Sequence, residues 1–186
     1  MDYSRFLAEG LSYGDFLAAH GTEDHQRRWQ AVHAAVKLTD AQRQLLAGFT
    51  RRMPVLCLAG AWCGDCVNQC PMFDHFAAAT SQIELKFYDR DKFPELAQEL
   101  KICGGARVPA VVFLSEDGLE VGRYGDRTLS RYRQLVAGLG GAACPTGLVV
   151  PEESMLAAVT QDWLNEFERA QWILRTSSRL RQLHGD

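Results

Sequence analysis

The feature that most constrains this chain is a pair of cysteines, Cys63 and Cys66, that lies between an apolar run and a helical pattern. The run at residues 55–59 is short and continuous, which predicts a strand buried on both faces. The pattern after the pair predicts a helix that extends to about residue 80. A thiol at the start of a helix lies near unpaired N–H groups and the positive end of the helix dipole, and both favour the thiolate. The motif therefore predicts thiol–disulfide exchange, in which the thiolate is the nucleophile.

The region around the pair, residues 53–139, alternates between strand and helix patterns. Further strands are predicted at residues 83–88, 111–114 and 120–124, and helices at 94–100 and 129–139. Asp117 and Gly118 lie between two of these strands and predict a hairpin turn. The element order is thus β-α-β-α-β-β-α, which is typical of an α/β domain.

Two flanking regions lack strand patterns. Residues 1–52 are predicted to be a helical N-terminal extension, with Thr22 and Thr39 as helix N-caps and Pro54 as the stop of its last helix. Residues 140–186 are predicted to form a Gly- and Pro-containing linker and a C-terminal helical arm that breaks near residues 176–178. We expect this arm to pack on the central domain; the alternative is an interaction helix for a partner or a second subunit.

Composition and charge narrow the functional classes. The chain has 186 residues and a net charge of −3, so it has no positive field to hold a nucleic acid. It has no apolar run of transmembrane length, and its start lacks the basic and apolar regions of a signal peptide. These features predict a cytoplasmic protein with neither nucleic-acid nor membrane partners. Its 6 cysteines are too few for a disulfide scaffold and are expected to be thiols, metal ligands or redox catalysts.

Residues 53–139 resemble a thioredoxin domain. The residues that carry the resemblance are Trp62 before the cysteine pair, the pair itself, Pro71 after it, Val108-Pro109 before a strand, and Gly125. The resemblance implies a thioredoxin fold, three α/β/α layers with a mixed central sheet, here with helical N- and C-terminal extensions. It also implies that Cys63 attacks, that Cys66 resolves, and that Pro109 is a cis-proline facing the pair. Trp62, Gly64, Asp65, Val108 and Pro109 are then the substrate-binding residues, and the backbone of Val108 pairs with the substrate chain.

Two positions depart from the family pattern. Asp65 stands where thioredoxins commonly have proline, and a carboxylate there is expected to make Cys63 less acidic. The alternative is that Asp65 simply caps the helix. Cys57 stands where the family has a buried carboxylate that assists proton transfer, which leaves water or Asp65 to take that part.

The resemblance implies a protein-disulfide reductase active in cell redox homeostasis. Its partners are protein disulfide substrates and an external reductant, either a reductase or a small thiol, and it needs no cofactor or metal. Two alternatives stay open: a redox-idle scaffold that binds peptides in the same groove, and a metal-binding module built on Cys63, Cys66 and Cys70. The roles of Cys57, Cys70, Cys103 and Cys144 are not predicted from the sequence.

Overall fold

A mixed four-stranded sheet forms the centre of the computed structural model, which describes residues 1–138 and 152–186. The strands are β1 (Met53–Ala59), β2 (Ile83–Asp89), β3 (Ala110–Leu114) and β4 (Glu120–Gly125), in the spatial order β2-β1-β3-β4. Strand β1 pairs in parallel with β2 and antiparallel with β3, and β3 pairs antiparallel with β4. Every residue of β1 and β3 is buried, as expected for central strands covered on both faces.

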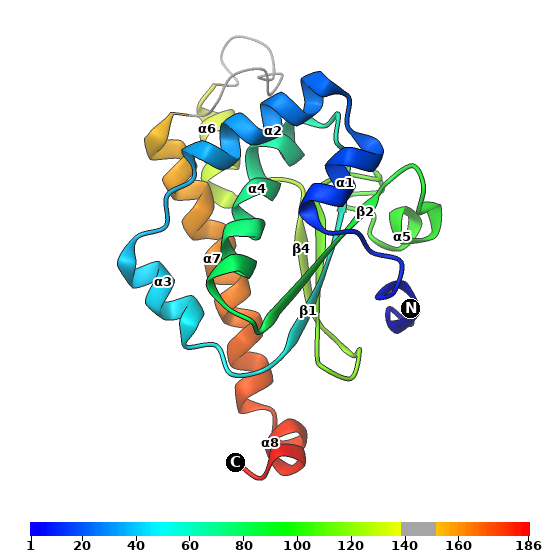
Figure 1. Cartoon of the computed structure of the whole chain (residues 1–186), viewed down its shortest axis with the longest axis vertical. Helices are drawn as coiled ribbons and strands as arrows, with labels where there is room; N and C mark the ends of the chain where they lie inside the picture. The colour runs from blue at the N-terminus through cyan, green and yellow to red at the C-terminus, as the bar shows by residue number, and fades with distance from the viewer. Residues whose placement is uncertain (139–151) are drawn as a thin grey trace.

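The helices of the described residues surround this sheet (Figure 1). They are η1 (Ser4–Phe6), α1 (Tyr13–His20), α2 (Glu23–Ala35), α3 (Asp40–Ala47), α4 (Gly64–Ala79), α5 (Pro94–Glu99), α6 (Leu129–Ala137), α7 (Glu153–Thr176) and α8 (Ser178–His184). The strand and helix order predicted for the central region is confirmed.

Local capping explains where the N-terminal helices begin. The side chain of Thr22 accepts a hydrogen bond from the backbone of His25, and Thr39 accepts one from Gln42, so both predicted N-caps are confirmed. The prediction for Pro54 is corrected, because α3 already ends at Ala47 and Pro54 is the second residue of β1. A proline near the start of a strand costs little, because its missing N–H falls where the ladder begins.

Alternation along β2 sends two aromatic side chains to opposite faces of the sheet. The ring of Phe87 packs among Tyr13, Phe16 and Trp29 of α1 and α2. The ring of Tyr88 packs against Phe93, just before α5, on the other face. Helices therefore cover both faces, which is the layered arrangement that the sequence predicts.

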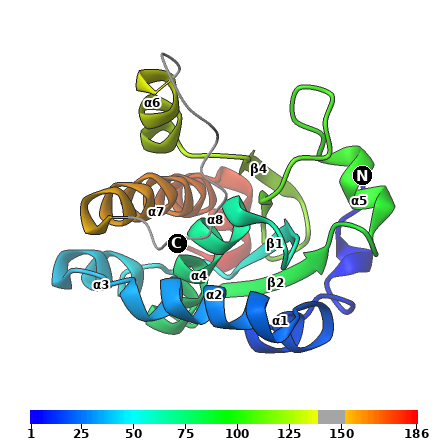
Figure 2. The ribbon, with the colours of Figure 1, turned by 90° about the horizontal axis from the view of Figure 1, so that it is seen from above.

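The closing position beside α4 is taken by α7 and not by α6. Phe167 of α7 packs edge-on against Phe76 of α4 and Phe113 of β3, and Trp163 packs edge-on against Tyr124 of β4. Helix α6 buries none of its side chains. Figure 2 shows α7 between α6 and α3. The expectation that the C-terminal arm packs on the central domain is thus confirmed for α7, because the larger apolar stripe lies on this longer helix.

The start of the chain is attached to β2. Leu11 and Phe87 exchange two backbone hydrogen bonds of 3.0 and 2.8 Å, in antiparallel orientation, just before α1. The C-terminal break is also confirmed, because α7 ends at Thr176 and Ser177 caps α8. The predicted linker at residues 140–151 lies outside the described residues, and the division into three parts stays a prediction. No helix of the described residues has both the length and the apolar character needed to cross a bilayer.

Candidate functional site

The turn between β1 and α4 brings the cysteine motif to the N-terminus of a helix. The backbone N–H of Cys63 donates to the Gly60 carbonyl at 3.0 Å, and Cys63 is the N-cap residue of α4. A β-carbon on Gly60 would lie 2.8 Å from the Trp62 ring, so a larger residue there would push this ring aside. The indole N–H of Trp29 in α2 donates to the Ala61 carbonyl at 2.8 Å, which ties the turn to the N-terminal helices.

The two cysteines of the motif differ in accessibility. Cys63 is half-buried, whereas Cys66, in the first turn of α4, has no exposed surface. The Cys63 thiol donates to the backbone carbonyl of Val108 at 3.5 Å. The Gly60 N–H donates to the Cys66 sulfur at 3.5 Å. An incoming group therefore reaches Cys63 first, and Cys66 lies behind it.

A hydrogen bond shared by the two thiols moves their pKa values apart. Burial raises the pKa of Cys66, but hydrogen bonds from Cys63, from Cys70 and from the Gly60 N–H outweigh burial and lower it to about 5. The shared hydrogen bond, followed by burial, raises the pKa of Cys63. The pair thus loses its first proton more readily than an ordinary thiol, and the charge belongs to both sulfurs. Of the two cysteines, only Cys63 is accessible to solvent.

The Val108–Pro109 peptide bond is cis, as the resemblance implies, and the Val108 carbonyl faces Cys63. Gly125 of β4 lies directly behind this turn. A β-carbon on Gly125 would lie 2.7 Å from the Pro109 carbonyl oxygen and 2.9 Å from the Ala110 α-carbon. Backbone atoms cannot yield as a flexible side chain can, so glycine at position 125 lets the proline turn sit where it does.

The carboxylate of Asp65 is bound by Arg127, a residue that the sequence did not predict to be part of the site. Arg127, which follows β4, binds its carboxylate at two points, with Nε–Oδ1 and Nη2–Oδ2 distances of 3.0 and 2.7 Å. Both side chains are mostly buried. The charge of Asp65 still acts to raise the pKa of Cys63, behind the larger effects of the shared hydrogen bond and burial. Gly64, the first residue of α4, lies between Cys63 and Asp65 and is half-buried.

A buried polar bridge connects the Arg127 segment to two helices. Gln69 of α4 donates to the Asp126 carbonyl at 2.8 Å and accepts from the indole N–H of Trp163 in α7, also at 2.8 Å. All three groups are satisfied, so the bridge fixes the segment that carries Arg127 without leaving a buried polar atom unpaired. Helix α7 thus supports the segment that carries Arg127, as Trp29 of α2 supports the turn before the cysteines.

Trp62 forms one wall beside the cysteines and is 44% exposed. The guanidinium of Arg90 lies 4.5 Å from the centre of its ring, a cation–π contact. Arg90 also borders a hollow whose other walls include Asp91, Lys101 and Ala106, so charges of both signs line it.

Among the cysteines outside the motif, two lie beneath it. Cys57 of β1 and Cys70 of α4 are fully buried, and their sulfurs are 3.8 Å apart. Cys103 is exposed, and Cys144 lies outside the described residues. All cysteines in the described residues are free thiols. In the same residues no group of three or more His, Cys, Asp or Glu side chains is arranged to hold a metal ion.

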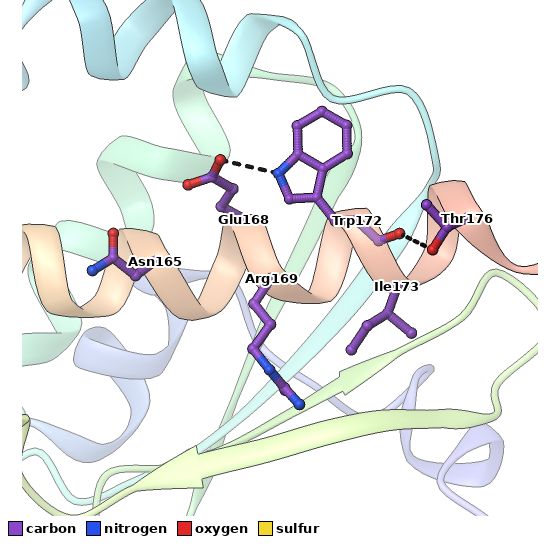
Figure 3. Close-up of a pocket in the computed structure, with 6 residues that line it drawn as sticks. All are labelled: Asn165, Glu168, Arg169, Trp172, Ile173 and Thr176. Atoms are coloured by element: carbon purple, nitrogen blue, oxygen red, sulfur yellow. Dashed lines mark hydrogen bonds between the residues drawn. The ribbon is translucent and has the colours of Figure 1, made fainter.

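A second hollow lies on the surface of α7 and contains none of the predicted site residues (Figure 3). Trp172 and Arg169 leave the helix in different directions there, and the Trp172 indole N–H donates to Glu168 at 3.0 Å. Its lining comes from one helix alone, so it brings no groups together from separate elements.

Comparison with known proteins identifies a family for this chain. The thioredoxin family model matches residues 10–137. A protein of unknown function from Pseudomonas aeruginosa, PA1234, has a similar structure, with a TM-score of 0.72 at 18% identity over 94% of this chain and 98% of that one. An HIV epitope-scaffold protein gives a TM-score of 0.64 at 20% identity over 96% and 100% of the two chains. At such identities these two likenesses show the fold alone. No curated protein matches the sequence.

Proposed function

The chain belongs to the thioredoxin family, and on that premise we propose that it is a thiol–disulfide oxidoreductase that reduces protein disulfides. The observation that carries the proposal is the placement of a half-buried Cys63 at the helix N-terminus, in front of a fully buried Cys66 and 3.5 Å from the Val108 carbonyl. That placement supplies an accessible nucleophile, a second thiol behind it, and a backbone group beside them.

In the first step the Cys63 thiolate attacks one sulfur of the substrate disulfide. A bond forms between the Cys63 sulfur and the attacked substrate sulfur, and the substrate S–S bond breaks. The other substrate sulfur leaves as a thiolate that takes up a proton. The substrate chain lies along Val108 and Pro109, because backbone pairing at Val108 orients its disulfide toward Cys63. Trp62 and Gly64 border the same surface, and Gly64 leaves room for the substrate chain.

In the second step Cys66 resolves the mixed disulfide. Its thiolate attacks the Cys63 sulfur, a Cys63–Cys66 disulfide forms, and the second substrate thiol is released. Two electrons pass from the pair to the substrate. The hydrogen bonds to Cys66 from Cys70 and from the Gly60 N–H are available in the mixed disulfide, and they favour this attack because the thiolate is the attacking form. An external reductant, either a reductase or a small thiol in the cytoplasm, then returns the pair to the dithiol.

Insulin reduction with dithiothreitol as the electron source tests the proposal. Cys63→Ser and Cys66→Ser are each expected to reduce the rate to the uncatalysed background. Cys103→Ser is the matched control, because it removes an exposed thiol outside the motif and should leave the rate unchanged. Equal rates in the parent and in Cys63→Ser would overturn the proposal and favour a redox-idle scaffold that binds peptides.

Trapping distinguishes the two cysteines. A Cys66→Ser variant should accumulate a mixed disulfide with the substrate at Cys63, because the resolving thiol is missing. A Cys63→Ser variant should accumulate none, because Cys66 is buried. Mass spectrometry under non-reducing conditions gives both results.

A further inference from the structure

The four thiols of the β1–α4 region form a connected series that reaches inward from the surface. Cys63 shares a hydrogen bond with Cys66, and Cys66 shares another with Cys70. The Cys70 sulfur is then 3.8 Å from the sulfur of Cys57 on β1. Only Cys63 is accessible, because the other three thiols have no exposed surface.

This series follows from how the two elements pack. Cys66 and Cys70 are four residues apart in α4 and so lie on one helix face. Cys57 is in the centre of β1, where it pairs with Phe87 of β2 and Val111 of β3. A single buried cysteine is usually no more than a small apolar side chain. Here Cys57 and Cys70 contact each other, and Cys70 is also hydrogen-bonded to the redox thiol Cys66. The two inner cysteines therefore form a dithiol that is connected to Cys66.

We propose that Cys57 and Cys70 form a second dithiol–disulfide couple, which reduces the Cys63–Cys66 disulfide through Cys66. The proposal rests on the function proposed above, and it adds a store of two further electrons inside the domain. A chain of this kind reduces two substrate disulfides before an external reductant is needed.

The exchange proceeds in two steps that balance. The Cys70 thiolate attacks the Cys66 sulfur, so a Cys66–Cys70 bond forms and Cys63 leaves as a thiolate. The Cys57 thiolate then attacks the Cys70 sulfur, so a Cys57–Cys70 disulfide forms and Cys66 leaves as a thiolate. The protons lost by Cys57 and Cys70 are taken up by Cys63 and Cys66. The oxidant is the Cys63–Cys66 disulfide, and two electrons move outward.

The geometry permits the second couple with limited movement. The sulfurs of Cys57 and Cys70 must approach by about 1.8 Å to form a disulfide bond of about 2.05 Å. Pro71 follows Cys70 directly and, having no N–H, leaves the Val67 carbonyl without its helical donor. Helix α4 can therefore bend next to Cys70. Burial raises the pKa of both Cys57 and Cys70, so the exchange should be slow and should accelerate as the pH rises.

Thiol counting after oxidation tests the proposal. The protein carries Cys103→Ser and Cys144→Ser, so that of its 6 cysteines only the four of the series remain. It is reduced, freed of reductant, mixed with excess hydroxyethyl disulfide, quenched in acid and alkylated after denaturation. The expected result is no free thiol and a cross-linked peptide pair that contains Cys57 and Cys70. Two thiols that remain free at Cys57 and Cys70 would overturn the proposal.

Variants in the same background separate the second couple from the first. Cys57→Ala leaves three thiols, and it should form the Cys63–Cys66 disulfide and keep Cys70 as a free thiol. Cys70→Ala should likewise keep Cys57 free, and it serves as a second variant if circular dichroism shows that Cys57→Ala is unfolded. Oxidation of the inner thiol that remains, Cys70 in Cys57→Ala or Cys57 in Cys70→Ala, in either folded variant would contradict the proposal, because that thiol would then be oxidised without its partner.

The Cys66→Ser variant tests the route. It should leave Cys57 and Cys70 reduced, because the connection to Cys63 is broken and the oxidant cannot reach the interior. A Cys57–Cys70 disulfide in this variant would show that Cys66 is not the connection and would overturn the proposal. None of these readouts needs a protein substrate, so failure of insulin reduction and failure of the second couple are distinguishable.

Discussion

Arg127 binds both carboxylate oxygens of Asp65, which lies inside the cysteine motif, although 62 positions separate the two residues in the sequence. The Asp65 charge acts to raise the pKa of Cys63, behind the shared hydrogen bond and burial, and the guanidinium bound to it carries the opposite charge. The two charges of this pair have opposite effects on a thiolate, so removal of one partner leaves the effect of the other.

Asp65→Asn should make the cysteine pair more acidic. It removes a carboxylate that disfavours the thiolate and leaves the Arg127 charge, which favours it. We expect the pH midpoint of iodoacetamide alkylation at Cys63 to fall by about one unit, which corresponds to about 1.4 kcal/mol. An unchanged or higher midpoint would show that the Asp65 charge does not act on the thiolate.

Arg127→Gln should shift the same midpoint upward. It leaves the Asp65 carboxylate without this guanidinium, so the thiolate becomes less favourable and alkylation at neutral pH slows. The double variant Asp65→Asn with Arg127→Gln is the matched control, because it removes both charges and should return toward the parent. A downward shift in Arg127→Gln alone would refute this account of the pair.

Gly125→Ala should disturb the proline turn. Its β-carbon would lie 2.7 Å from the Pro109 carbonyl oxygen, so the backbone must move, at a cost of about 1–3 kcal/mol in the free energy of unfolding. Because Val108 moves with that turn, insulin reduction should fall at least as strongly. Gly122→Ala in the same strand is the control, since its β-carbon would meet only an Arg169 nitrogen at 3.6 Å. Equal melting temperatures and equal activity for the two variants would contradict this prediction.

Trp29→Phe should loosen the turn before the cysteines. It leaves the Ala61 carbonyl without its indole donor, and an unpaired buried acceptor costs about 1–3 kcal/mol. Urea unfolding measures the loss. Trp172→Phe is the control, because that indole is 50% exposed and its removal should change stability by less than about 0.5 kcal/mol. A loss of similar size in both variants would count against a special role for the Trp29 hydrogen bond.

The pH dependence of the reduced pair has a definite sign. Hydrogen bonds lower the pKa of Cys66 to about 5 against the effect of its burial, and the thiolate form exists above that pH. The ultraviolet thiolate absorbance of the reduced pair should therefore rise as the pH increases through about 5 and reach the level of one thiolate at neutral pH. In Cys66→Ser the rise should move toward the ordinary thiol range near pH 8.5. A parent profile that rises only near pH 8.5 would exclude the shared charge.

Much of the fold could be predicted because its signals are local. The apolar run at residues 55–59 and the caps Thr22 and Thr39 each act within one element, and the structure confirms the strand and both caps. The cis bond before Pro109 followed from the family resemblance. These signals do not depend on which elements later come together.

The parts that the sequence did not predict depend on contacts between distant segments. Arg127 reaches Asp65 only after β4 joins the sheet, and a lone arginine in a sequence gives no sign of its partner. The packing of α7 against α4 and the sheet has the same origin, because Trp163 and Phe167 contact aromatic residues of α4, β3 and β4. The contact of Cys57 with Cys70 likewise needs a strand and a helix to pack. Spacing within α4 relates Cys70 to Cys66, but no spacing along the chain relates either of them to Cys57.

The pairing of Leu11 with Phe87 means that the N-terminal segment covers part of the edge of the sheet. Strand β2 is the outermost strand on its side, and Leu11 occupies hydrogen-bonding groups there that would otherwise be open to another chain. A shortened protein beginning at residue 53 would present a bare strand margin lined with the apolar surface that α1 and α2 now cover. Such a fragment should self-associate in solution, because the first helices no longer cover the apolar surface of β2.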